Sequence, residues 1–126
     1  MDVAGTQKRP FNPLYGLLAL ALLGALAAAV AAYGGWWQLA AFAIGPDVAL
    51  LAGIAPGLDK GQLHPRAVPL YNLLHRFWGP AALAALAVTV LPEIWLVGAL
   101  AWALHVAVDR TVGYGLRTPA GFQRQS

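Results

Sequence analysis

The sequence contains no cysteine and few charges, because Lys, Arg, Asp and Glu together make up 10% of its 126 residues. The absence of cysteine excludes disulfides, thiolate metal sites and cysteine nucleophiles. Soluble domains carry about 25% charged residues, so these charges are too few to cover the surface of a soluble monomer. A hydrophobic content of 60% also excludes a disordered chain. The net charge of +3 forms no basic stripe, so we expect no nucleic-acid partner.

The sequence has instead four apolar segments, each close to the length of about 20 residues that a membrane-spanning helix needs. They cover residues 14–33, 36–55, 70–91 and 93–112. Gly34-Gly35 and Pro92 mark two short connections between them. The sequence therefore predicts an all-α integral membrane bundle of four transmembrane helices, arranged as two helical hairpins in a single domain of residues 1–126.

The basic residues outside these segments all fall on one predicted side of the membrane. They precede the first segment, separate the second from the third and follow the fourth: Lys8, Arg9, Lys60, Arg66, Arg117 and Arg124. Loops rich in Lys and Arg stay in the cytoplasm. We therefore expect the lipid bilayer as a partner and both termini in the cytoplasm.

Ionisable residues inside a membrane segment are costly and mark a functional site. Here they are joined by the amide of Asn72, and the set consists of Asp47, His75, Arg76, His105, Asp109 and Arg110. At 1.5 Å per residue, three helices place these groups at a similar depth in the cytoplasmic half of the bilayer. His105 and Asp109 are four residues apart, so they share one helix face.

Two carboxylates and two imidazoles form an oxygen and nitrogen ligand set that suits zinc, iron or manganese. We predict a divalent metal held by Asp47, His75, His105 and Asp109. Four protein ligands leave no open position, which favours a structural ion unless one Asp serves instead as a general base. In the alternative without metal, Asp47 pairs with Arg76 or Arg110.

The chain resembles a family of four-span bacterial membrane proteins, a domain of unknown function. Three motifs carry this resemblance: Gly-Pro-Asp at 45–47, Tyr-Asn-Leu-Leu-His at 71–75 and His-x-x-x-Asp-Arg-x-x-Gly-Tyr-Gly-Leu at 105–116. More distantly, Pro46-Asp47, His75-Arg76 and residues 105–119 resemble LexA-binding inner-membrane metal-dependent hydrolases. That second family has a further Asp where this chain has Ala49, and a further His where it has Gly79 and Pro80. These departures argue against a two-metal site, and they leave open one metal or no metal at all. The resemblance implies a bacterial inner (cytoplasmic) membrane.

The expected function is a metal-dependent hydrolase that acts on a lipid or another membrane-embedded substrate, with Asp47, Asn72 and Arg110 as catalytic residues. Asn72 would orient the substrate, and Arg110 or Arg76 would hold its phosphate or carboxylate. Two alternatives stay open. One is a small transporter whose Asp/His relay moves protons or a cation, which would need a homodimer to enclose a path. The other is an accessory subunit of a larger membrane complex, in which the polar cluster is structural.

Overall fold

The computed structural model describes residues 10–124, so Lys8 and Arg9 lie outside the described residues. Two short 3₁₀ turns accompany the helices, which are α1 (Pro13–Tyr33), α2 (Trp36–Ile44), α3 (Val48–Ala52), α4 (Val68–Leu74), α5 (Trp78–Thr89) and α6 (Trp95–Val112). Residues 10–124 contain no strand beyond one isolated bridge between Arg117 and Gln123. The all-α fold class is therefore confirmed.

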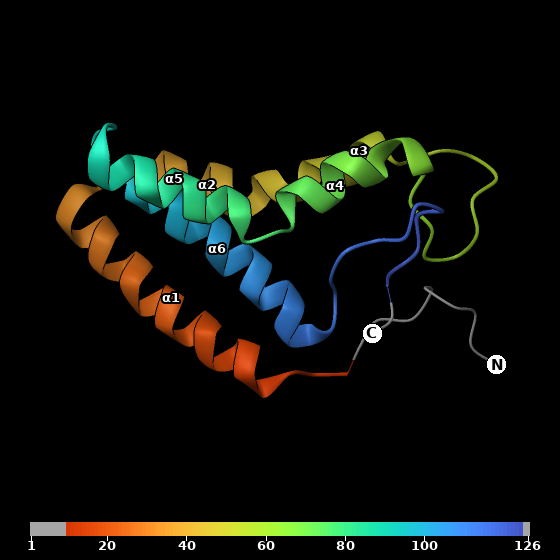
Figure 1. Cartoon of the computed structure of the whole chain (residues 1–126), viewed down its shortest axis with the longest axis horizontal. Helices are drawn as coiled ribbons and strands as arrows, with labels where there is room; N and C mark the ends of the chain where they lie inside the picture. Colours follow the sequence, from red (N-terminus) through yellow and green to blue (C-terminus); the bar gives the residue numbers. More distant parts are fainter. Residues whose placement is uncertain (1–9, 125–126) are drawn as a thin grey trace.

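Helix α6 lies at the centre of the fold, and α1, α2 and α5 all pack against it (Figure 1). Its buried surface is made largely of small residues, among them Gly98, Ala99, Ala101 and Ala107. Small side chains let the neighbouring helices approach closely. Helices α5 and α6 form the second predicted hairpin. The first predicted hairpin does not form a packed pair of helices, because α1 and α2 each pack on α6 and make no extensive contact with each other.

Helix α1 is the one described helix that is long and apolar enough to cross a membrane. It has 21 residues, and Asn12 caps its start because Asn12 Oδ1 accepts hydrogen bonds from the N–H groups of Leu14 at 3.0 Å and Tyr15 at 3.4 Å. Apolar side chains such as Leu14 and Leu20 are exposed along it. The length and composition of α1 support association with a membrane.

The second and third predicted spans are interrupted. Residues 36–55 form α2, a 3₁₀ turn at Gly45–Asp47 and α3, which ends at Ala52. Residues 70–91 fall in α4, which begins earlier at Val68, and α5, with a break at 75–77. Pro80 has no N–H for the carbonyl of Arg76, so it fits only the first turn of a new helix. The fourth helix begins at Trp95 rather than at residue 93. The structure therefore leaves the four-span bundle unconfirmed.

Side chains of α6 satisfy carbonyl groups that the two breaks release. Three of them each donate one hydrogen bond of 2.6–3.0 Å to such a carbonyl: Trp102 to Leu74, His105 to Ala43 and Arg110 to His75. A buried carbonyl without a partner would cost free energy. The breaks are therefore stabilised by α6.

We expect Gly79→Ala to destabilise the fold by about 1–3 kcal/mol, because a Cβ at this position would collide with the ring of Trp102. The displaced ring would lose its hydrogen bond to the Leu74 carbonyl. Thermal unfolding in detergent checks this result. Gly24→Ala is the matched control, because a Cβ there would meet no atom within 4 Å. Equal melting temperatures for the two variants would contradict the prediction.

A candidate metal centre at two helix breaks

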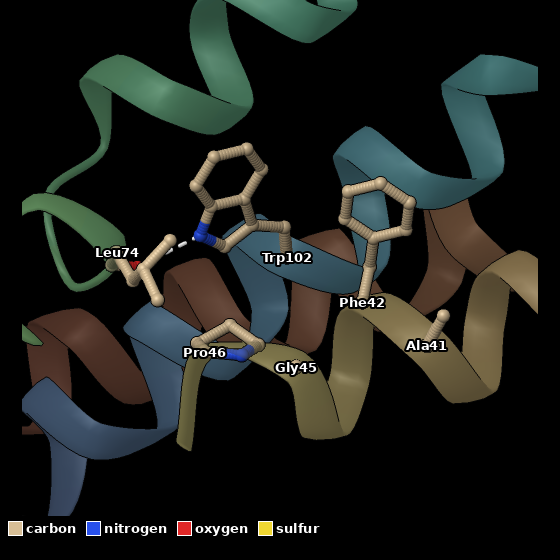
Figure 2. Close-up of a pocket in the computed structure, with 6 residues that line it drawn as sticks. All are labelled: Ala41, Phe42, Gly45, Pro46, Leu74 and Trp102. Atoms are coloured by element: carbon tan, nitrogen blue, oxygen red, sulfur yellow. Dashed lines mark hydrogen bonds between the residues drawn. The ribbon is translucent and has the colours of Figure 1, made fainter. Parts of the chain in front are cut away.

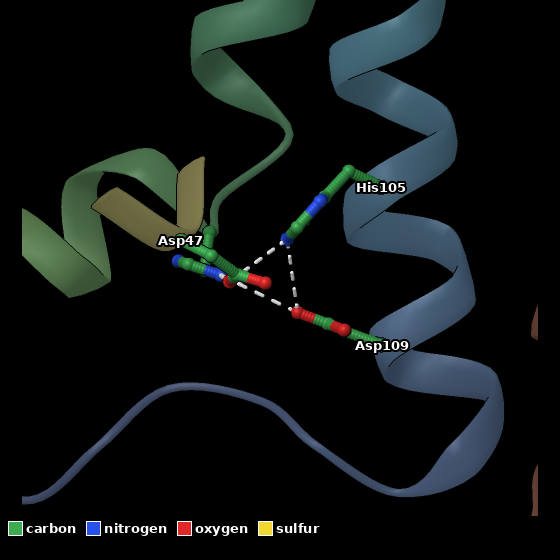
Figure 3. A group of neighbouring side chains, drawn as sticks. Asp47, His105 and Asp109 are labelled. Carbon is green, nitrogen blue, oxygen red and sulfur yellow. Dashed lines mark hydrogen bonds and ion pairs between the residues drawn. The ribbon is translucent and has the colours of Figure 1, made fainter. Parts of the chain in front are cut away.

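Four of the predicted site residues meet at the two breaks. Asp47 ends the 3₁₀ turn between α2 and α3, and His75 is the C-terminal capping residue of α4. His105 and Asp109 project from successive turns of α6 toward Asp47 (Figure 3). One ligand atom from each of Asp47, His75, His105 and Asp109 lies within 4.8 Å of all the others, so this group could hold a metal ion. The structure therefore brings together the four residues that the sequence analysis named as metal ligands.

Both imidazoles are oriented by backbone carbonyls. His75 Nδ1 lies 2.8 Å from the carbonyl of Tyr71, and His105 Nδ1 lies 2.6 Å from that of Ala43. A carbonyl only accepts hydrogen bonds, so each Nδ1 carries the proton. In the neutral ring Nε2 then presents a lone pair to the cluster. Histidines that bind metals are oriented in this way by a hydrogen bond from the other ring nitrogen.

Four of the six distances between the ligand atoms, those between carboxylate oxygen and imidazole nitrogen, match those around a small cation. Asp47 Oδ1 lies 3.1 Å from Nε2 of both His75 and His105. Asp109 Oδ2 lies 3.3 Å from His75 Nε2 and 3.4 Å from His105 Nε2. Four ligands placed tetrahedrally about 2.0–2.1 Å from zinc lie about 3.3–3.4 Å apart. The four oxygen–nitrogen distances therefore fit a ligand shell of this size, and the other two pairs of ligand atoms lie within 4.8 Å of each other.

The cluster is closed on one side and open on the other. The side chain of His75 is 1% exposed and that of His105 is 10% exposed, whereas Asp109 is 22% and Asp47 is 45% exposed. With both rings neutral, two carboxylate oxygens would face two lone pairs with no hydrogen between them. The arrangement thus requires positive charge at its centre, from an ion or from protons on the imidazoles.

Asn72 lies beside the cluster but its amide is engaged elsewhere. Its Nδ2 donates to the carbonyl of Arg117 at 3.0 Å, and its Oδ1 accepts from the Arg117 N–H at 2.7 Å. These two bonds fasten the C-terminal segment to α4. The role of Asn72 toward a substrate stays a prediction.

Arg76 and Arg110 line a cleft between α5 and α6 and are not among the four candidate metal ligands. Arg110 donates to the carbonyl of His75 at 3.0 Å and lies over the ring of Phe77. Arg76 is exposed. Within residues 10–124 neither arginine forms an ion pair with Asp47 or another carboxylate. The pairing proposed as the alternative without metal is therefore not observed.

Two further residues outside the predicted ligand set, Tyr71 and Arg117, support His75. The ring of Tyr71 stacks on His75 with centroids 3.9 Å apart and planes 13° apart, and the guanidinium of Arg117 lies 4.9 Å from the Tyr71 centroid on α4. Tyr71 is four residues before His75, a spacing that places both on one helix face. The four-residue spacing is therefore the sequence feature that could have predicted the contact of Tyr71 with His75. Nothing local in the sequence indicates the contact with Arg117.

An apolar groove adjoins the cluster (Figure 2). It has a volume of about 240 Å³ and is lined by Ala41, Phe42, Gly45, Pro46, Leu74 and Trp102. Pro46 and Leu74 immediately precede Asp47 and His75 in the chain. The groove is therefore next to the residues that position two of the four ligand atoms.

The fold and the site together define a class: an α-helical protein with an apolar N-terminal helix and an Asp/His group able to hold a metal ion. Residues 16–126 match the family described as "Domain of unknown function (DUF4260)", and the chain belongs to this family. No curated protein and no solved structure matches the chain. The expected membership in a domain of unknown function is thus confirmed.

Proposed function

We propose that this protein is a metal-dependent membrane hydrolase whose reaction takes place at the cluster of Asp47, His75, His105 and Asp109. The observation that carries this proposal is the convergence of four ligand atoms within 4.8 Å while both Nδ1 atoms are held by carbonyls. The oxygen and nitrogen ligands favour zinc, iron or manganese. The distant resemblance to inner-membrane metal-dependent hydrolases agrees with this chemistry.

The burial of the ligands suggests a division of roles. His75, His105 and Asp109 are the more buried side chains and would hold the ion. Asp47, at 45% exposure, stands at the open side and would act as general base, exchanging between the ion and a water. Three protein ligands with one open position are the pattern of catalytic zinc sites. A bound ion would lower the pKa of a water and polarise the bond to be cleaved.

The proposal places the cluster in the cytoplasmic half of a bacterial inner membrane, with four spans and both termini in the cytoplasm. Interrupted helices are tolerated inside a membrane where their free backbone groups find partners within the protein. The hydrogen bonds from α6 to the two breaks meet this condition. Large apolar side chains also remain exposed on other helices, including Trp36, Val48, Leu73 and Val88.

The proposed substrate is a lipid or another membrane-embedded ester. The apolar groove beside Pro46 and Leu74 offers a place for an apolar chain near the ligands. The open side at Asp47 gives a water or a polar group access to the cluster. A homodimer or a larger complex stays a prediction about its partners.

The first experiment is elemental analysis of the detergent-purified protein beside its His105→Ala and Asp109→Ala variants. We expect about one equivalent of zinc, iron or manganese in the parent. Both variants should lose the ion, because each lacks one metal ligand and therefore binds the metal more weakly. Asp47→Asn should retain the ion. It should lower hydrolysis of carboxylic and phosphate esters in mixed micelles by about 10²–10⁴-fold, since it removes the base.

Protein that stays free of metal after reconstitution would overturn the proposal. The Asp/His relay of a proton- or cation-coupled transporter would then account for the cluster, with protons supplying its positive charge. Metal bound without any hydrolysis would reduce the cluster to a structural site of an accessory subunit.

A further inference from the structure

We infer that a cleft between the start of α5 and the end of α6 binds the phosphate group of an anionic membrane lipid. The cleft has a volume of about 500 Å³ and is lined by Arg76, Phe77, Trp78, Ala81, Arg110 and Leu116. This inference rests on the proposed function for the placement of the chain in a membrane. It does not depend on the metal.

The cleft carries two positive charges without a negative partner. Within residues 10–124, no carboxylate forms an ion pair with Arg76 or Arg110. Arg110 is held in place by its Nη2 bond of 3.0 Å to the His75 carbonyl, while its buried Nε has no hydrogen-bond partner. Two guanidinium groups in one cleft suit a phosphate, which accepts two parallel hydrogen bonds from each.

The first turn of α5 adds to this positive potential. Phe77, Trp78 and Ala81 form part of the cleft wall, and the helix has no side-chain cap at its N-terminus. A helix N-terminus carries a partial positive charge that attracts anions. The break at 75–77, which orients His75, thus also provides the start of α5 beside the two arginines.

The apolar part of the wall indicates an amphiphile rather than a small free anion. Leu116 and Ala81 line the cleft, and Trp78 at its edge is 79% exposed. Tryptophan is enriched at the level of lipid headgroups. Arg76 follows His75 in the chain and Arg110 follows Asp109, so the bound headgroup would lie next to the candidate metal centre.

The test measures binding of fluorescently labelled phosphatidylglycerol to the purified full chain in mixed micelles, by anisotropy. We expect Arg110→Gln and Arg76→Gln each to weaken binding roughly tenfold, because each removes a charged hydrogen-bond partner. Arg124→Gln is the matched control, with the same loss of charge on an exposed residue outside this cleft, and should change binding less than twofold. Labelled phosphatidylcholine should bind more weakly than phosphatidylglycerol.

Arg110 also donates to the His75 carbonyl, so Arg110→Gln is compared only where it unfolds at the temperature of the parent. The side chain of Arg76 makes no hydrogen bond or ion pair within the described residues, so binding by Arg76→Gln is by itself a sufficient test. Unchanged binding by Arg76→Gln, or an equal loss in Arg124→Gln, would overturn the inference. Displacement of the lipid by millimolar inorganic phosphate would show that the site takes a free phosphate, which also overturns it. Metal content is measured in the same samples. Absence of metal would count against the proposed hydrolase function, whereas unchanged lipid binding by Arg76→Gln would count against the lipid site.

Discussion

Removal with a chelator of the ion proposed for the cluster is expected to lower the free energy of unfolding by about 4 kcal/mol, where the free ion before chelation exceeds its dissociation constant a thousandfold. The ion would connect α6 to the ends of both breaks through His75, His105, Asp109 and Asp47. Without it, the two carboxylates face two imidazole nitrogens across 3.1–3.4 Å and need protons instead. Reversible unfolding in mixed micelles, before and after chelation, measures this loss.

Two variants of equal charge change make this result specific. Asp109→Asn should unfold at the same denaturant concentration with and without chelator, because it lacks one of the three side chains proposed to hold the ion. Asp59→Asn should respond to the chelator as the parent does, because Asp59 lies exposed in the loop between α3 and α4. A chelator that leaves the parent unaffected would show that protons, rather than an ion, occupy the cluster.

The sequence predicts the site better than it predicts the helices around it. Asp47, His75, His105 and Asp109 lie at a similar depth in the predicted helices, which indicates one polar cluster, and in the structure their ligand atoms lie together. Pro46 lies in the 3₁₀ turn Gly45–Asp47 that interrupts the second segment. The few polar residues that an apolar chain cannot leave exposed therefore carry most of the sequence information about where the site lies.

The break at 75–77 and the central place of α6 could not be predicted from hydropathy. A window of about 20 residues averages over the three residues between α4 and α5, so residues 70–91 resemble one helix. The break is stable because Trp102 and Arg110 donate to its carbonyls from a distant part of the chain. The contact of Arg117 with Tyr71 is likewise formed only once the C-terminal segment folds back. Such long-range contacts leave no periodic signal in the sequence.

Gly121→Ala is expected to destabilise the protein by about 3–4 kcal/mol and to reduce metal retention. Residues 114–124, which we name the C-terminal strap, fold back over the loop before α4. Gly121 has a φ of +104°, and a Cβ there would collide with the carbonyl of Leu63, a backbone group that has little freedom to move. The substitution would break the 2.9 Å bond from the Leu63 N–H to the Gly121 carbonyl, and the 2.8 Å bond from Arg117 Nη1 to that same carbonyl.

The matched control separates backbone strain from docking of the strap. Gly57 has a φ of +80°, and a Cβ there would meet no atom within 4 Å, so Gly57→Ala should cost only about 1–2 kcal/mol. Metal retention should fall in Gly121→Ala alone, because Arg117 stacks on Tyr71 and Tyr71 stacks on His75. Equal losses of stability, with metal retained in both variants, would show that the strap does not position His75. A selective loss would mean that the ligand geometry depends on a segment more than 40 residues away in the chain, since Arg117 N–H and Asn72 Oδ1 join positions separated by 45.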